Sequence, residues 1–389
     1  MKEPMEGIVQ AFSLPRWIEA EPGCISNAGH WAAKFGSRAM VVSGTGSARR
    51  FGLLDKIENS LKKAGLPYEI FDRVEREPVL ETAEEGAGIA RRAGCDVVIG
   101  VGGGSAMDAA KLIAMLRDNT GPAEEYQLGE RDWEAGCCPW IAIPTTAGTG
   151  SEATKVSVMS NKRLGVKKAL YSWEMVSTVT LLDAEACVNM PPDLTRDTGL
   201  DALGQAIEGY LSTGSNPITA AAALRAVRLV HRFLPRAVED GGDLEARHNM
   251  LIAAMLGGVA IDTGVGLGHE MAMAVGSFKG LSHGLLVGVL TPWCLEPNLG
   301  YADSKMTDLA DAFGSAHGEA DLKARRLVQL VRDFQQQVGC PATLGELGVS
   351  EEEIGPILEA SKLSTDIGTN PCPLDDEIRA GALAAAIGG

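Results

Sequence analysis

The side chains best suited to bind a metal ion lie in three stretches of the second half of this 389-residue chain. Asp201, Gln205 and Glu208 occur at positions i, i+4 and i+7, a spacing that places them on one face of a helix. Two of the six histidines follow, His269 and His283. One aspartate and two histidines form a ligand set suited to Fe(II) or Zn(II) that leaves coordination positions open. From spacing alone, buried side chains satisfied by hydrogen bonds are the better interpretation.

A second group of residues is suited to hold phosphate groups. Val97–Val101 predicts a buried strand, the turn Gly102-Gly103-Gly104-Ser105 follows, and a helix begins at the end of this turn. Backbone N–H groups of a glycine turn approach a diphosphate closely, and a helix N-terminus adds a favourable dipole. Ser105 and Asp108 also fit a capping box, which would set the start of the helix. A turn without a ligand is the alternative, because the pattern is not G-x-G-x-x-G.

A third stretch carries hydroxyl groups and glycines directly after an apolar run. It reads Pro144-Thr145-Thr146-Ala147-Gly148-Thr149-Gly150-Ser151-Glu152. Threonine hydroxyls and free backbone amides suit a sugar, an amide or a phosphate as ligand. A capped helix start is the structural alternative, and from this stretch alone it is the better one.

The first half of the chain alternates short apolar runs with amphipathic stretches. The predicted strands are Arg38–Ser43, Tyr68–Phe71, Asp96–Val101 and Trp140–Pro144. The predicted helices between them are Leu53–Ala64, Glu81–Ala93 and one that begins at Ser105. Alternation of this kind predicts a parallel α/β sheet that is covered on both faces.

The second half is rich in alanine and leucine and predicts helices. These are Gly199–Ser212, Thr219–Phe233, Leu244–Ile261, Ser304–Phe313, Leu322–Val338 and Glu351–Ser361. The texture changes at 184–192, around Met190-Pro191-Pro192. Two domains also fit the chain length, at roughly 150 residues each. We therefore expect an α/β domain over residues 1–187 and an all-α domain over 188–389.

Composition limits the remaining possibilities. The formal net charge is −16, with 51 acidic against 35 basic residues, so nucleic acid and anionic lipid surfaces would be repelled. No apolar stretch approaches the roughly 18 residues that a membrane span needs, and Met1–Glu6 shows no basic region leading into an apolar run. The eight cysteines contain no C-x-x-C pair, which favours reduced, buried thiols. We expect a cytoplasmic protein without nucleic-acid or membrane partners.

Four blocks in one order resemble the iron-containing (group III) alcohol dehydrogenase family. They are Gly102-Gly103-Gly104-Ser105 with Asp108 and Lys111, the Pro144–Glu152 stretch, Thr198-Gly199-Leu200-Asp201-Ala202-Leu203, and His269 through His283-Gly284. The resemblance extends over nearly the whole chain. It implies an N-terminal dinucleotide-binding α/β domain and an all-α C-terminal domain that binds metal and substrate, a fold similar to that of dehydroquinate synthase. It also suggests a homodimer.

The resemblance implies metal ligands residue by residue. Asp201, His269 and His283 match three family ligands, and Gln205 stands where the family usually has a histidine. Gln205 could coordinate through its amide oxygen; a three-ligand site would instead resemble the glycerol dehydrogenase branch, in which zinc is usual. The expected metal is therefore Fe2+ or Zn2+. Many members carry a further histidine where this chain has Met273, so no proton relay is named.

The same resemblance implies how a nicotinamide cofactor is bound. The glycine turn would hold the pyrophosphate, Thr145, Thr146 and Thr149 would position the ribose and nicotinamide, and Lys167 (or its neighbour Lys168) would lie near the cofactor. Many NAD-using members have an aspartate where this chain has Gly44. Without that carboxylate a 2′-phosphate fits, with Thr45, Ser47 and Arg49 or Arg50 as contacts, so NADP(H) is favoured over NAD(H).

The predicted activity is reversible hydride transfer between NAD(P)H and a small aldehyde or alcohol, with Asp201, His269 and His283 as the catalytic metal site. Two alternatives remain open. One is a reductase of an anionic, maleylacetate-type carbonyl. The stretch Thr369-Asn370-Pro371-Cys372 resembles a family Asn-Pro-Arg motif, in which Cys372 replaces the basic arginine, and this argues against an anionic substrate. The other is a nucleotide-binding relic without catalysis, suggested by Gln205 and Met273.

Overall fold

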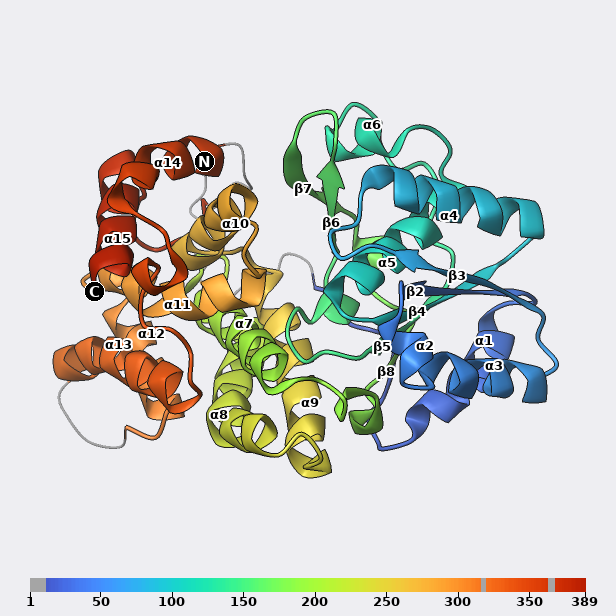
Figure 1. The fold of residues 1–389 in the computed structure, drawn as a ribbon, viewed down its shortest axis with the longest axis horizontal. Coiled ribbons are helices and arrows are strands. Elements are labelled where there is room, and N and C mark those ends of the chain that lie inside the picture. The colour runs from blue at the N-terminus through green and yellow to red at the C-terminus, as the bar shows by residue number, and fades with distance from the viewer. Residues whose placement is uncertain (1–11, 316–319, 363–367) are drawn as a thin grey trace. The chain divides into compact units, whose positions relative to one another are not determined.

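The computed structural model describes residues 12–315, 320–362 and 368–389 (Figure 1). Within these residues the chain forms two compact units. We call Ser13–Met190 with Gly241–Ile252 the first unit, and Pro191–Asp240 with Ala253–Gly389 the second unit. The start of the chain, on which the expectation of no secretory segment rests, lies outside the described residues.

The first unit is built on a parallel sheet of six strands in the order β1-β8-β5-β4-β2-β3. The strands are β1 (Trp17–Glu19), β2 (Ala39–Gly44), β3 (Tyr68–Val74), β4 (Val97–Gly102), β5 (Trp140–Pro144) and β8 (Val179–Leu181). A separate antiparallel hairpin consists of β6 (Val156–Asn161) and β7 (Val166–Tyr171). The predicted parallel α/β sheet is confirmed, with β2 to β5 at the four predicted places.

Helices cover both faces of this sheet, because its strands are apolar on both sides. The helices of the first unit are α1 (Ala28–Phe35), α2 (Ser47–Arg50), α3 (Leu53–Lys63), α4 (Leu80–Ala93), α5 (Gly104–Asp118) and α6 (Ala123–Gln127). On β2, Met40 and Val42 pack with α4 and α5, while Ala39 and Val41 face the opposite way and pack with α1 and α3. This alternation with period two is what a buried strand requires.

The second unit is helical, as expected. Its helices are α7 (Pro192–Leu211), α8 (Pro217–Glu239), α9 (Leu244–Ile261, whose first part belongs to the first unit), α10 (Leu267–Lys279), α11 (His283–Leu295), α12 (Asp303–Ala312), α13 (Ala320–Gln337), α14 (Ile354–Ser361) and α15 (Asp376–Gly388). Helix α7 is buried on nearly all sides after its first turn and contacts α8, α10, α11 and α12. Polar side chains on α7 therefore point into the interior of this unit.

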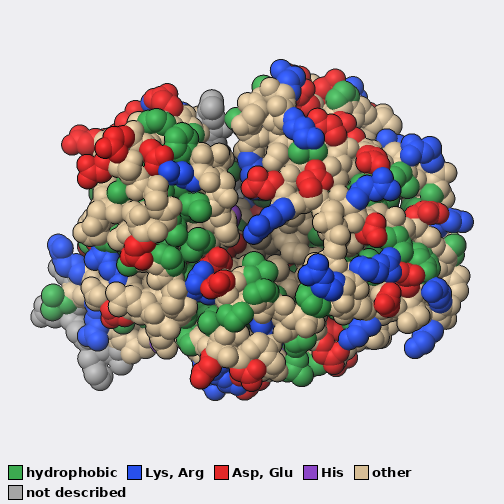
Figure 2. All heavy atoms as spheres, in the orientation of Figure 1, with side chains coloured by type: hydrophobic (Ala, Val, Ile, Leu, Met, Phe, Trp, Pro, Cys, Tyr) green, Lys and Arg blue, Asp and Glu red, His purple; other side chains and the backbone are tan. Residues whose placement is uncertain are grey.

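Short 3-10 helices complete the described structure. They are η1 (Cys24–Asn27), η2 (Ser151–Ala153), η3 (Trp173–Met175), η4 (Ala184–Cys187), η5 (Glu296–Asn298), η6 (Gly345–Leu347) and η7 (Glu351–Glu353). Among the described helices, none has both the length and the apolar character that crossing a bilayer demands. Figure 2 shows both acidic and basic side chains on the visible face, with several acidic ones gathered at the upper left.

Candidate metal and dinucleotide sites

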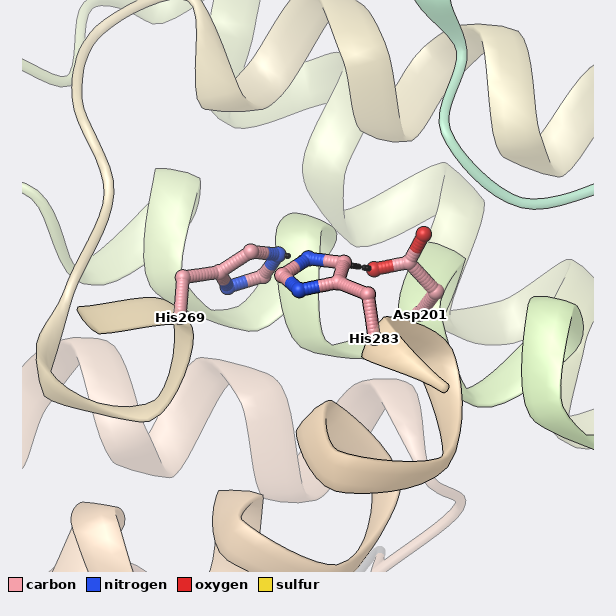
Figure 3. Close-up of side chains that lie close together, drawn as sticks. All are labelled: Asp201, His269 and His283. Carbon is pink, nitrogen blue, oxygen red and sulfur yellow. Dashed lines mark ion pairs between the residues drawn. The ribbon is translucent and has the colours of Figure 1, made fainter. Parts of the chain in front are cut away.

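Three helices of the second unit bring Asp201, His269 and His283 together. Asp201 lies in the middle of α7, His269 in the first turn of α10, and His283 is the first residue of α11. The side chains point toward one another (Figure 3), with Oδ1 of Asp201 3.6 Å from Nε2 of His269 and 3.7 Å from Nε2 of His283. One ligand atom from each residue lies within 4.8 Å of the others. The structure therefore groups the three residues that sequence spacing alone could not place.

Small residues let the helices that carry these ligands approach closely. A Cβ atom at Gly204 of α7 would lie only 2.4 Å from Cγ1 of Val287 on α11. A Cβ atom at Gly284 would lie 2.5 Å from the backbone oxygen of Asp197. Because both positions are glycine, α7 and α11 can approach each other closely on either side of Asp201. This close packing is what places the N-terminal residue of α11 beside the aspartate.

Several polar atoms of this cluster are buried without a hydrogen-bond partner. Among the described residues, the atoms in that condition include Oδ1 of Asp201, Oε1 of Gln205 and Nε2 of His269. An isolated buried polar atom is unfavourable by roughly 1–3 kcal/mol. The atoms of Asp201 and His269 lie 3.6 Å apart, and Gln205 is one turn after Asp201 on α7, so these atoms indicate a missing partner. A divalent cation accepts electron pairs from carboxylate, amide oxygen and imidazole together. The residues present therefore fit a metal ion.

Glu208 holds the other side of the His269 ring. Oε2 of Glu208 lies 2.7 Å from Nδ1 of His269. Burial lowers the pKa of His269, but the carboxylates of Glu208 and Asp201 outweigh burial and raise this pKa to about 10. Burial raises the pKa of Glu208, yet the adjacent His269 and backbone N–H donors bring it below its ordinary value. The sequence had placed Glu208 on the same helix face without assigning it a role.

The two positions that depart from the family pattern are also located. Gln205 lies one turn after Asp201 on α7 and is buried, and Oε1 would be 3.3 Å from a Cβ atom at Gly257 of α9. Met273 lies half-buried on α10, one turn after His269. Gln205 is thus buried one turn from a candidate ligand, and its Oε1 atom has no hydrogen-bond partner.

The Thr369–Cys372 segment packs against the chain that leads into α10. The Thr369 hydroxyl donates to the backbone oxygen of Val265 at 3.3 Å. Oδ1 of Asn298 accepts from Nδ2 of Asn370 at 3.1 Å and from the backbone N–H of Cys372 at 3.0 Å. The Cys372 thiol is buried, and burial raises its pKa. In this chain the segment therefore packs beside the start of α10, with the Cys372 side chain in the interior.

The glycine turn and the threonine stretch of the first unit form one surface. The backbone N–H of Thr145 donates to the oxygen of Gly102 at 2.9 Å. Gly102 has φ of 149°, a backbone conformation that side chains disfavour. A Cβ atom at Gly103 would lie 3.1 Å from the Thr146 hydroxyl oxygen, and one at Gly104 would lie 2.7 Å from Cγ2 of Thr149. The structure thus joins two stretches that the sequence had identified separately.

The predicted capping box at the start of α5 is wrong. The helix begins after Gly103, which is its N-cap, and no side chain caps it. The Ser105 hydroxyl donates to the backbone oxygen of Arg76 instead. Asp108 accepts from the Ser151 hydroxyl at 2.6 Å and from the backbone N–H of Val158 at 3.1 Å. The local S-x-x-D pattern was misleading because both partners of Asp108 come from far along the chain.

Lys111, which the family resemblance had included in its first block, is fully buried one turn after Asp108. Its ammonium donates to the backbone oxygens of Ser151 at 2.6 Å and Val156 at 2.7 Å, and to the hydroxyl of Thr154 at 3.1 Å. A buried ammonium is tolerated only with such a set of acceptors. Lys111 therefore fastens α5, which follows the glycine turn, to the segment that follows the threonine stretch.

The residues expected near the adenosine end of the cofactor lie at the end of β2 and in α2. Gly44 is the last residue of β2, and a Cβ atom there would lie 3.5 Å from the oxygen of Val74, an ordinary contact. Ser47 begins α2. Arg49 is paired with Glu58 at 2.6 Å, among other carboxylates. Of the two candidate arginines, Arg49 therefore forms ion pairs within the protein.

Lys167 lies on β7 of the hairpin, with Nζ 3.4 Å from Oε1 of Glu77. Burial raises the pKa of Asp108, and several groups, among them the Lys167 ammonium, lower this pKa in part. Lys167 therefore belongs to the same polar region as the first turns of α5.

Comparisons with known proteins agree over both units. Residues 15–184 match the iron-containing alcohol dehydrogenase family, and residues 195–379 match the C-terminal part of the Fe-containing alcohol dehydrogenase family. Alcohol dehydrogenase 4 of Schizosaccharomyces pombe is 32% identical over 376 residues, which are 96% of this chain and 88% of that protein. The NAD-dependent methanol dehydrogenase of Bacillus methanolicus is 33% identical over 88% of this chain and 91% of its own length. A solved structure of a 1,3-propanediol oxidoreductase superimposes with a TM-score of 0.93 at 30% identity, covering 97% of this chain and 100% of that one.

A parallel α/β unit with a glycine turn can bind a dinucleotide, and a helical unit that groups an aspartate and two histidines can hold a metal ion; together with the relatives, they indicate a metal-dependent nicotinamide dehydrogenase. The chain belongs to the iron-containing alcohol dehydrogenase family. The predicted enzyme class, an oxidoreductase that acts on CH–OH groups with a nicotinamide cofactor, is confirmed. Neither the anionic-carbonyl reductase nor the catalytically inactive relic is favoured by these relatives.

Proposed function

We propose that Asp201, Gln205, His269 and His283 hold one divalent cation, Fe2+ or Zn2+, and that this site serves reversible reduction of a small aldehyde by NADPH. The observation that carries the proposal is the set of three buried atoms without partners, contributed by Asp201, Gln205 and His269. When bound, a divalent cation supplies Lewis-acid polarisation of the substrate oxygen. The chain contributes the ligand cage and excludes water from Asp201 and His269, which are both buried.

Metal content measured by elemental mass spectrometry tests the site directly. Protein purified without oxygen and loaded with Fe2+ or Zn2+ should retain about one ion per chain. Asp201→Ala should lose the ion and the reduction of aldehyde by NADPH. Asp197→Asn is the matched control, since Asp197 is a buried acid one turn earlier on α7, and it should keep the ion. Wild-type protein that retains no ion under either loading would refute the proposal.

Gln205 makes this ligand set richer in oxygen than one aspartate with three histidines. Because an amide oxygen is a weaker ligand for Zn2+ or Fe2+ than imidazole, Gln205→His should bind Zn2+ more tightly. A Gln205→Leu variant removes the oxygen at similar size and should bind the ion more weakly than wild type. Equal affinities in wild type and Gln205→Leu would exclude Gln205 as a ligand and leave a site with three protein ligands.

For the first unit, we propose that the glycine turn and Thr145, Thr146 and Thr149 bind the dinucleotide, with Lys167 near it. The contact of Gly103 with Thr146 and of Gly104 with Thr149 supports this proposal, because it joins both stretches into one surface. Glycines let a diphosphate approach the backbone and the start of α5. On this view residues 1–187 carry the cofactor and residues 188–389 carry the metal.

We propose further that NADP(H) is preferred over NAD(H), because Gly44 leaves the end of β2 without a carboxylate. Gly44→Asp is a suitable test, because a Cβ atom at this position makes only ordinary van der Waals contact with the protein. The ratio of kcat/KM for NADPH to that for NADH should fall at least about tenfold in Gly44→Asp. Gly44→Asn has the same size without the charge and should change the ratio much less. An unchanged ratio in Gly44→Asp would overturn the preference.

The oligomeric state and cellular location are proposals as well. We propose a cytoplasmic homodimer that acts on small alcohols and aldehydes and binds neither nucleic acid nor membrane. The relatives support the substrate class, since they are named for an alcohol, methanol and 1,3-propanediol. Light scattering coupled to size exclusion tests the dimer, for which a mass near twice 40.8 kDa is expected.

A further inference from the structure

We infer that Glu208 is a positioning residue for the metal site: its carboxylate fixes the His269 ring so that Nε2 faces Asp201. This inference rests on the proposed metal site and adds to it a residue outside the ligand set. Glu208 lies two turns after Asp201 on α7 and is buried. Its position on α7 therefore places the ligand and the group that orients a second ligand on one rigid helix.

One carboxylate accepts three hydrogen bonds from the start of α10. Oε2 of Glu208 accepts from the backbone N–H of Gly266 at 2.7 Å and lies 2.7 Å from Nδ1 of His269. Oε1 accepts from the backbone N–H of His269 at 3.2 Å. Because the Glu208 carboxylate can only accept, Nδ1 keeps its proton, and the ring can bind a metal only through Nε2, the atom that faces Asp201. The ring is thereby held in both its tautomer and its orientation.

The glycines around His269 are explained by the space that this carboxylate occupies. A Cβ atom at Gly268 would lie 2.6 Å from Oε1 of Glu208, and one at Gly266 would lie 3.0 Å from its Cδ. Gly266 has φ of −111°, which other residues also adopt, so backbone conformation does not require glycine there. The Gly266-Leu267-Gly268-His269 sequence thus makes room for Glu208 beside the histidine.

A simpler role for Glu208 is to cap α10. Its two backbone hydrogen bonds satisfy N–H groups at the start of the helix, and a negative charge there interacts favourably with the helix dipole. Capping alone would affect the stability of the metal-free protein, but not the affinity for metal. The hydrogen bond to Nδ1 of His269 adds a specific expectation, because loss of such outer partners typically weakens metal binding about 10–100-fold.

The test is the affinity of Glu208→Gln for Co2+ and Zn2+, measured by competition with a chromophoric chelator. Glutamine has the same shape, but its amide carries no charge and has only one acceptor oxygen for three donors. We expect the dissociation constant to rise about 10–100-fold and the visible absorption bands of bound Co2+ to shift. Thermal unfolding of the metal-free protein is recorded in parallel, so that a capping effect is measured separately.

Glu270→Gln is the matched control. Glu270 is the next residue after His269, is buried, and pairs with Arg379 at 3.1 Å. Glu270→Gln removes one negative charge beside the start of α10, as Glu208→Gln does, but it leaves the contacts of the His269 ring in place. The metal affinity of this variant should therefore stay close to that of wild type. If Glu208→Gln does not fold, Gly268→Ala replaces it, since the added Cβ atom must displace the Glu208 carboxylate.

The outcomes separate the two proposals. Wild-type affinity in Glu208→Gln, or in Gly268→Ala if the first variant does not fold, would overturn the role of Glu208. Equal losses in Glu208→Gln and Glu270→Gln would also overturn it, because they would reflect charge alone. Failure of the wild-type protein to bind Co2+, Zn2+ or Fe2+ would instead refute the metal site itself.

Discussion

Substitution of Lys111 by methionine should destabilise the first unit by about 3 kcal/mol. The ammonium of Lys111 is fully buried and donates to the backbone oxygens of Ser151 and Val156 at 2.6 and 2.7 Å. Methionine fills similar space but donates nothing, so two buried carbonyl groups lose a charged donor. Each loss is worth roughly 1–3 kcal/mol, offset in part by the relief of a buried charge. Asp108 also loses a nearby cation, 3.9 Å away.

Tryptophan fluorescence during urea unfolding is a suitable assay for this variant. Of the six tryptophans, those in the first unit are Trp17, Trp31, Trp133, Trp140 and Trp173, so the signal reports mainly on that unit. Lys168→Met is the control, because Lys168 is exposed on β7, and it should lie within about 0.5 kcal/mol of wild type. A loss below about 1 kcal/mol for Lys111→Met would refute the view that Lys111 fastens α5 to this segment.

Three further predictions concern the pH dependence of stability, two glycine substitutions and the removal of metal. Burial raises the pKa of Glu152 from 4.5 to about 7, so the unfolded chain loses this proton at a lower pH than the folded chain. The free energy of unfolding should therefore fall by up to about 3 kcal/mol between pH 4.5 and 7. Glu152→Gln should remove this part of the pH dependence, as measured by urea titrations. Gly209→Ala should destabilise the second unit by about 1–3 kcal/mol, because the new Cβ atom would lie 2.5 Å from the Ala260 backbone. Gly381→Ala, on the exposed side of α15, has no atom near the new Cβ and should stabilise the unit by about 0.5–1 kcal/mol. Calorimetry distinguishes the two variants. Removal of metal by a chelator should lower the melting temperature, because an ion present at 100 to 1,000 times its dissociation constant stabilises the folded state by about 3–4 kcal/mol. An unchanged melting temperature, in protein shown to hold metal beforehand, would contradict this.

The sequence predicted the elements that have long, regular apolar patterns and missed the short ones. Strands β2, β4 and β5 are buried apolar runs next to glycine or proline, and β3 has a short apolar stretch after Pro67. Strands β1 and β8 have three residues each and carry no periodic pattern. The β6–β7 hairpin has no regular alternation, since apolar Val158 and Met159 are adjacent in β6 and polar Lys167 and Lys168 are adjacent in β7. Pattern therefore identifies strands only where several residues repeat it.

The candidate site was predictable in its residues but not in its geometry. Asp201 and Glu208 stand out as acidic residues on an otherwise apolar helix, whereas the two histidines are identified as ligands by the family resemblance. That Glu208 orients His269 depends on how α7 packs against α10, which spacing along the chain does not determine. The error at Asp108 has the same origin, because a local pattern could not reveal partners 43 and 50 residues away.

The division of the chain into units has a consequence for how the protein folds during synthesis. The first unit includes Gly241–Ile252, although residues 191–240 of the second unit are made in between. Within that late segment, Arg247 is buried and donates to the backbone oxygens of Gly241 at 3.0 Å and Met190 at 3.2 Å. Domains usually fold in the order in which they leave the ribosome. Here the first unit can reach its final packing only after part of the second has emerged, because a fragment that ends at Met190 would lack Gly241–Ile252, a segment of the first unit.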